Sequence, residues 1–167
     1  MTGENMDRCG NQLDAAAITV ADGVTIRLTD YAHRQLIKRV LEEFIPHFAP
    51  GGTVLYIGDA GENCKYFDEA GLAALNVKVD THLKIPAVII YYPTKNWIFL
   101  IDTVAGNGPI KARRRSELAK LFASSTAGRI YISVFPDRAD FARYSTKISW
   151  NTDVWIADSP THMVHYR

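Results

Sequence analysis

Cysteine is scarce in this sequence, neither sign of charge prevails, and no long apolar segment is present. Cys9 and Cys64 are the only cysteines in 167 residues and match no metal-ligand spacing. Two thiols do not make the disulfide framework of a small secreted protein, and they suit a reducing compartment. The formal net charge is only +1, so any nucleic-acid binding must come from a local basic patch.

The longest apolar stretches are far shorter than a membrane span. The N-terminal segment is neither basic nor apolar enough to be a targeting signal. The chain is therefore expected to be cytoplasmic, without membrane association, and long enough for one domain with a full core. Residues 1–28 are expected to form an N-terminal arm and short strands with a turn at Asp22-Gly23, and residues 29–167 the main domain.

Hydrophobic periodicity predicts an α/β fold with a mixed central β-sheet flanked by helices. A first amphipathic helix is expected after a Thr29 or Asp30 cap, ending near Pro46 and Pro50. The later elements are expected as a strand at 53–57, a helix at 67–75, a strand or connector at 77–80, strands at 85–92 and 97–104, a helix from the basic cluster at 111–115 to about 126, a strand at 129–135, a helix from 136–138 onward and a last strand at 154–157. Trp97, Trp150 and Trp155 are expected to pack in the core or at its rim, and His162 and His165, which alternate as in a strand, are assigned no role.

The runs 85–92 and 97–104 are rich in β-branched and aromatic residues and are separated by Pro-Thr-Lys-Asn, which predicts a β-hairpin. With Thr94 and Lys95 at the tip, Ala87 lies opposite Asp102. Directly opposed residues share a face of the sheet with their side chains in contact range. The sequence therefore predicts a carboxylate at an apolar strand end that reaches solvent, beside a position that holds only a methyl group.

A basic cluster follows Asp102 after a Gly-Asn-Gly-Pro turn: Lys111, Arg113, Arg114 and Arg115. An acidic strand end beside a basic helix start can hold a divalent metal and a phosphate together. The structural interpretations are a turn or cap hydrogen bond for Asp102 and a solvated helix face for the cations. Asp59, which follows a glycine at a strand end, is either a further metal-side acid or a turn residue.

From about Asp30 to Tyr166 the chain resembles the catalytic domain of the PstI/BsuBI type II restriction endonucleases, which belong to the PD-(D/E)XK nuclease superfamily. The matching stretches are FAPGGTVLYIGD, KYFDEAGLAALNV, the D-x-H-x-K-x-P of Asp80–Pro86, NWIFLID, NGPIKARRRSEL, LFASSTAGRIYISVFPDRA and ISWNTDVWIADSPTHMVHY. The resemblance implies magnesium-dependent hydrolysis of phosphodiester bonds in double-stranded DNA, and a homodimer because double-strand cleavage needs two sites.

By the same resemblance, the second catalytic acid falls at Asp102, where the family usually has glutamate, and the first falls at Ala87. The superfamily lysine falls at Val104, the family histidine of the next turn at Asn107, and a family lysine at Lys84. Lys84 is left open as the source of the missing amine, since strand alternation places it on the other face from Asp102.

Loss of the acid at position 87 removes a ligand and a negative charge, so cleavage is expected to be very weak or absent. Two explanations stay open: a natural relative that lost activity, or an active enzyme altered at this position. The alternative function is a non-catalytic DNA-binding or protein-interaction module. Candidate DNA contacts are the basic cluster, Asn107 and His82.

Overall fold

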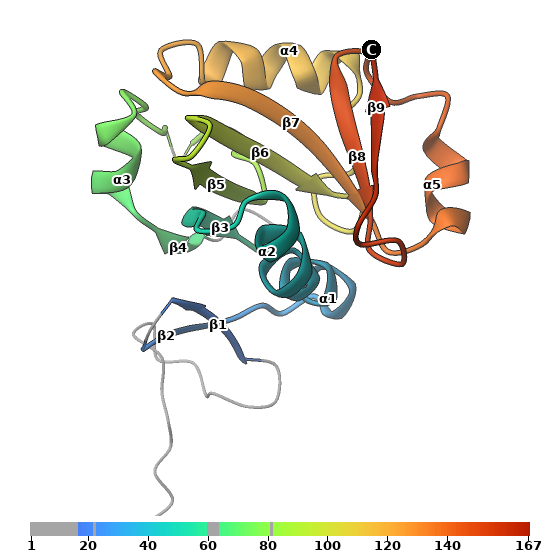
Figure 1. Cartoon of the computed structure of the whole chain (residues 1–167), viewed down its shortest axis with the longest axis horizontal. Helices are drawn as coiled ribbons and strands as arrows, with labels where there is room; N and C mark the ends of the chain where they lie inside the picture. The colour runs from blue at the N-terminus through green and yellow to red at the C-terminus, as the bar shows by residue number, and fades with distance from the viewer. Residues whose placement is uncertain (1–16, 22, 60–63, 81) are drawn as a thin grey trace, which may run out of the picture.

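The computed structural model describes residues 17–21, 23–59, 64–80 and 82–167, and its main feature is a seven-stranded mixed sheet with the order β4-β3-β5-β6-β7-β8-β9 (Figure 1). The strands of this sheet are β3 (Thr53–Gly58), β4 (Cys64–Phe67), β5 (Val88–Tyr92), β6 (Trp97–Thr103), β7 (Gly128–Phe135), β8 (Thr152–Ile156) and β9 (Met163–Tyr166). β6, β7 and β8 run parallel, and the other neighbours are antiparallel. The predicted α/β class with a mixed sheet is confirmed.

Helices cover both faces of this sheet. The α1 (Tyr31–Arg39), η1 (Val40–Phe44) and α2 (Ile45–Phe48) segments pack on one face, and α3 (Glu69–Ala74) and α4 (Ala112–Leu121) share the core on the other. α5 (Arg138–Tyr144) packs against Phe135, Val154 and Ile156. Among the described residues no helix has both the length and the apolarity to cross a bilayer.

The first helix begins where its capping residue predicts. The Asp30 side chain accepts a hydrogen bond from the His33 N–H at 2.8 Å. The middle of the helix is a π-helical turn, which ends just before Pro46. Proline has no N–H to donate and its ring clashes with the carbonyl four residues earlier. We attribute the wider turn to this clash, and the helix ends at Phe48, between Pro46 and Pro50 as predicted.

The β5–β6 hairpin has the predicted register. Val88 faces Ile101 and Tyr92 faces Trp97, which is the alignment that places Ala87 opposite Asp102. Asn96 adopts a positive φ of 53° at the end of the turn, a conformation that asparagine tolerates. The pairing that the functional prediction rests on is therefore present.

A smaller antiparallel hairpin precedes the main fold: β1 (Ala17–Ala21) pairs with β2 (Val24–Arg27). Gly23 of its predicted turn has φ +73°, while Asp22 lies outside the described residues. Ile18 and Ile26 are buried in the same core cluster as α1. The hairpin thus contributes apolar surface to the face of the sheet that α1 covers.

The two edge strands of the sheet differ in how the pattern predicts them. The pattern does not mark β4 as a strand, whereas β9 contains His165, whose alternation with His162 is strand-like. Residues 77–80 form a connector, one of the two alternatives expected there. β4 has four residues, so its alternation covers too few positions to stand out from a loop. Of the three tryptophans expected in the core or at its rim, Trp155 is fully buried, whereas Trp150 is 67% exposed and lies beside the Tyr166 ring.

Tyr56 on β3 gives the fold a dependence on alkaline pH. Burial of its hydroxyl raises the pKa of Tyr56 to about 12, and the charge of Cys64 acts in the same direction. The unfolded chain loses this proton near pH 10 and the folded chain keeps it, so stability falls as pH rises from 10 to 12. We therefore compare the free energy of unfolding of Tyr56→Phe with that of the parent at two pH values. The difference between the two proteins should shift in favour of Tyr56→Phe by about 1 kcal/mol from pH 7 to pH 11. Denaturant unfolding of both proteins at the two pH values measures it, and an identical difference at both would contradict it.

Candidate active site

The candidate site lies at the end of two central strands, where β5 begins and β6 ends. The backbone N–H of Ala87 donates to Asp102 Oδ1 at 3.2 Å. On the other side of β5, the Gly58 N–H donates to the Ala87 carbonyl at 2.9 Å. Three adjacent strands therefore meet at position 87, and the Asp102 carboxylate lies directly next to it.

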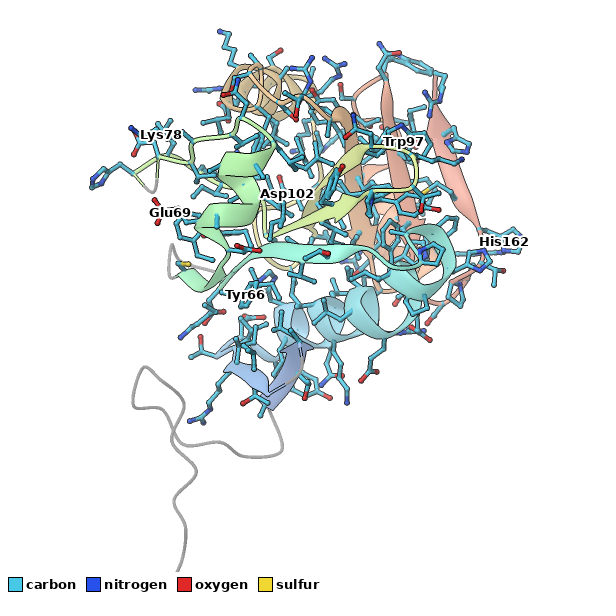
Figure 2. All side chains as sticks on the ribbon, turned by 60° about the vertical axis from the view of Figure 1, so that its left-hand side comes forward. Tyr66, Glu69, Lys78, Trp97, Asp102 and His162 are labelled. Atoms are coloured by element: carbon cyan, nitrogen blue, oxygen red, sulfur yellow. The ribbon has the colours of Figure 1, made fainter. Side chains whose placement is uncertain are left out.

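Asp102 does not reach solvent, contrary to the prediction. It has no exposed surface and lies inside the molecule, whereas Glu69, Lys78 and His162 lie on the outside (Figure 2). Its Oδ2 accepts from Arg114 Nε at 2.8 Å, an ion pair buried on both sides. The reason is the position of α4, which begins directly after the turn and packs across this end of the sheet.

The basic cluster is divided by the helix rather than presented together. Arg114 points inward, on the same helix face as the buried Leu118, while Lys111 and Arg113 are exposed and Arg115 is half-buried. The Arg115 guanidinium lies 4.8 Å from the centre of the Tyr131 ring. A helix places residues three or four apart on one face, so three adjacent arginines cannot all point the same way.

The turn after β6 brings Asn107 to the same carboxylate. Asn107 Nδ2 donates to Asp102 Oδ1 at 3.0 Å and to the Ile85 carbonyl at 3.1 Å. Lys84, whose carbonyl accepts from Arg114 Nη1 at 2.7 Å, has an exposed side chain. Asn107 thus contacts Asp102 through its side-chain amide, and Lys84 contacts Arg114 through its backbone carbonyl rather than its amine.

Asp59 and His82 lie apart from this cluster. Asp59 follows β3 and is buried, and its Oδ2 accepts from the Thr29 N–H at 3.1 Å and the Thr29 hydroxyl at 2.8 Å. These bonds connect Asp59 to the segment before the first helix, 30 residues earlier in the chain, rather than to its own turn. His82 is exposed, and its N–H donates to Asp80 Oδ1.

His33 of α1 is a site neighbour that the sequence analysis missed. Its buried ring bridges Thr103, at 2.8 Å from Oγ1, and the Gly58 carbonyl, at 2.9 Å. The carbonyl only accepts, so Nε2 donates to it, and in the neutral ring Nδ1 accepts the Thr103 hydroxyl proton. A Cβ at Gly106 would lie 2.8 Å from His33 Nδ1, so the turn that carries Asn107 passes close against this ring. No sequence motif marks a lone histidine in the first turn of a helix.

The residues present do not fit a divalent metal ion. Asp102 supplies an acid at the junction of β5 and β6, but its oxygens already bind an arginine and an asparagine, and Ala87 supplies no ligand. Within the described ranges no three His, Cys, Asp or Glu side chains are grouped as metal ligands. Magnesium needs oxygen ligands and keeps the remainder as water, which one fully engaged carboxylate cannot provide.

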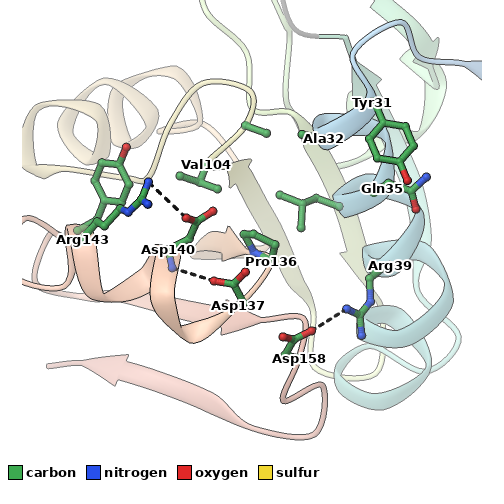
Figure 3. Close-up of a pocket in the computed structure, with 13 residues that line it drawn as sticks. Tyr31, Ala32, Gln35, Arg39, Val104, Pro136, Asp137, Asp140, Arg143 and Asp158 are labelled. Carbon is green, nitrogen blue, oxygen red and sulfur yellow. Dashed lines mark hydrogen bonds and ion pairs between the residues drawn. The ribbon is translucent and has the colours of Figure 1, made fainter.

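A cleft of about 530 Å³ opens at the same end of the central strands, between α1 and α5 (Figure 3). Val104, Ala105 and Pro136, which follow β6 and β7, form part of its wall, while Ala87 and Asp102 are not among its residues. Its charged groups pair within the wall, Arg39 with Asp158 at 3.3 Å and Arg143 with Asp140 at 3.7 Å. The cleft therefore flanks the site on the α1 side, whereas the Asp102 carboxylate faces α4.

Comparisons with known proteins agree on one family. The profile of the BsuBI/PstI restriction endonuclease domain matches residues 16–167. The chain is 46% identical over 155 residues to the type II restriction enzyme BsuBI of Bacillus subtilis, a match that covers 93% of this chain and 49% of that enzyme. It is 24% identical over 156 residues to the type II restriction enzyme AplI of Arthrospira platensis, covering 89% of this chain and 48% of that enzyme.

The fold also matches a solved structure. The SdaI restriction endonuclease superposes with a TM-score of 0.84 and 32% sequence identity, covering 90% of this chain and 48% of SdaI. The chain spans about half the length of the relatives it matches. Since the family profile extends over nearly the whole described chain, the predicted resemblance is confirmed: the chain belongs to the BsuBI/PstI restriction endonuclease domain family.

Proposed function

We propose that this chain is the DNA-cleaving domain of a type II restriction endonuclease, with magnesium as the cofactor of the intact site and cleavage impaired because Ala87 stands in place of an aspartate. The observation that carries the proposal is the 3.2 Å contact between the Ala87 N–H and Asp102 Oδ1. Because the backbone N–H of position 87 already bonds to the Asp102 carboxylate, an aspartate side chain at position 87 would extend from a point next to that second acid. Two carboxylates would then replace one at the strand junction.

The proposed substrate is double-stranded DNA. Lys111 and Arg113 are exposed at the start of α4 and Arg115 is half-buried there, a placement suited to phosphate contacts, which position a protein on DNA without reading its sequence. Arg114 and Asn107 instead act on Asp102. A homodimer is part of the proposal because cutting both strands takes two copies of a site, and the cytoplasm is the proposed location because DNA is there.

A second candidate is a DNA-binding module without catalysis. The buried ion pair between Asp102 and Arg114 favours it, since it satisfies the carboxylate without any metal. Under this hypothesis the exposed cations of α4 still bind DNA, whereas Asp102 only stabilises the fold through its ion pair with Arg114.

One experiment separates the two candidates. The chain, Ala87→Asp and the uncharged control Ala87→Asn are incubated with plasmid DNA, with and without magnesium, and gel shifts at moderate salt are recorded in parallel. Asparagine matches aspartate in size but supplies no negative charge, so only Ala87→Asp should give discrete, magnesium-dependent fragments. Folding of all three proteins is checked by circular dichroism.

The other outcomes are equally decisive. If no protein cuts DNA but all shift it, the non-catalytic module is correct. If no folded protein binds DNA at moderate salt, both candidates are wrong and a protein partner is indicated.

A further inference from the structure

Both oxygens of the Asp102 carboxylate accept hydrogen bonds from protein donors, and the side chain has no exposed surface. Oδ1 accepts from the Ala87 N–H at 3.2 Å, from Asn107 Nδ2 at 3.0 Å and, more weakly, from Arg114 Nη2 at 3.4 Å. Oδ2 accepts from Arg114 Nε at 2.8 Å. Because Asp102 has no exposed surface, a further ligand can reach this carboxylate only by displacing one of these donors.

Arg114 is the donor with a full positive charge, and it is fixed at both ends of its guanidinium. Nη1 donates to the Lys84 carbonyl at 2.7 Å, while Nε and Nη2 face Asp102. Its side chain is only 9% exposed, and its other acid, Glu117, is farther away at 3.8 Å. Planar, two-point contact of this kind is the geometry in which arginine binds a carboxylate most strongly.

We propose that Arg114 is the resident cation of this site and competes with a divalent metal ion for Asp102. The proposal rests on the proposed function and explains why these residues do not fit a metal. The buried negative charge of Asp102 is balanced by the buried positive charge of Arg114. A divalent cation added beside them would be repelled by the Arg114 guanidinium, because the protein interior screens charges poorly.

The charge balance sets an order of metal affinities. The chain as written should bind weakest. Ala87→Asp adds one negative charge and should bind better. The double variant Ala87→Asp with Arg114→Gln has two carboxylates and no guanidinium, so it should bind a divalent cation most tightly, while glutamine keeps donors for the Lys84 carbonyl.

The first test measures Mn²⁺ binding by calorimetry without DNA, since manganese takes the same carboxylate and water ligands as magnesium. The double variant should bind Mn²⁺ at least about 10-fold more tightly than Ala87→Asp, because it lacks the guanidinium charge that repels the ion at short range in a poorly screening interior. Equal or weaker binding by the double variant, or no binding by either protein, would overturn the proposal.

A second measurement keeps Arg114 in place, in case its substitution prevents folding. In Ala87→Asp, the Nε–H of Arg114 is followed by NMR while Mg²⁺ is added. Its exchange with water should accelerate as the ion takes its place on Asp102, while the Arg39 Nε–H, bonded to Glu43 at 2.6 Å, stays unchanged as the control. A metal that binds near Asp102 while the Arg114 proton stays protected contradicts the competition. Because no DNA is present, failure of cleavage and failure of this proposal are separate results.

Discussion

Arg114→Met should lower the free energy of unfolding by about 3–5 kcal/mol, the usual cost of removing one partner of a buried ion pair. The Asp102 carboxylate would remain in the interior with only the Asn107 amide and the Ala87 N–H as donors. Methionine retains most of the volume of the side chain, so the loss reports the charge rather than a cavity. Denaturant unfolding at pH 7 measures it.

Arg113→Met is the matched control for this variant. Arg113 is the preceding residue of the same helix, its side chain is 94% exposed, and its ion pair with Glu117 lies on the surface. Surface ion pairs contribute at most about 1 kcal/mol, so this substitution should cost little. Similar losses for the two variants would show that Arg114 does not carry a buried charge pair.

The double variant Arg114→Met with Asp102→Leu sharpens the same test. Replacing both partners of a buried pair by apolar side chains is often neutral or stabilising, so the double variant should be more stable than Arg114→Met alone. A double variant that loses the sum of the two single losses would indicate independent contributions.

Trp155→Ala should also cost about 3–5 kcal/mol, the range for a large aromatic side chain removed from a core. Trp155 has no exposed surface, its ring lies edge-on to Phe44 at 5.5 Å between centroids, and Nε1 donates to the Pro160 carbonyl at 3.0 Å. The substitution removes both the packing across the sheet face and a hydrogen bond at the β8–β9 turn. Thermal or denaturant unfolding checks the prediction.

Trp150→Ala makes the same chemical change at an exposed position. Trp150 is 67% exposed and contacts mainly the Tyr166 ring, at 6.0 Å between centroids. It should cost less than about 1.5 kcal/mol, the upper end for an aromatic pair. A loss at Trp150 as large as that at Trp155 would mean that burial does not distinguish the two positions.

The parts of the fold that depend on local pattern were predictable. The β5–β6 register follows from the turn residues and from two adjacent apolar runs, and the Asp30 cap follows from one side chain. In both cases the interacting residues are near neighbours in the chain. The four-residue edge strand β4 is too short to show a period, and so it was missed.

The environment of Asp102 was not predictable in the same way. The sequence placed Asp102 opposite Ala87 correctly, but not its burial, because that depends on how α4 packs back across the sheet to bring Arg114 into contact. His33 approaches from the opposite face, 70 residues before Thr103 in the chain. Contacts of this kind are set by tertiary packing, whereas hydrophobic periodicity predicts only secondary structure.

Under the proposed function, position 87 and Asp102 form one catalytic site from which a carboxylate is missing. The most direct test is the rate of magnesium-dependent DNA cleavage by Ala87→Asp relative to the chain as written. The rate should increase at least about 100-fold, since even partners one step removed from a metal change activity by 10–100-fold. Equal rates for the two folded proteins, with DNA bound by both, would contradict it.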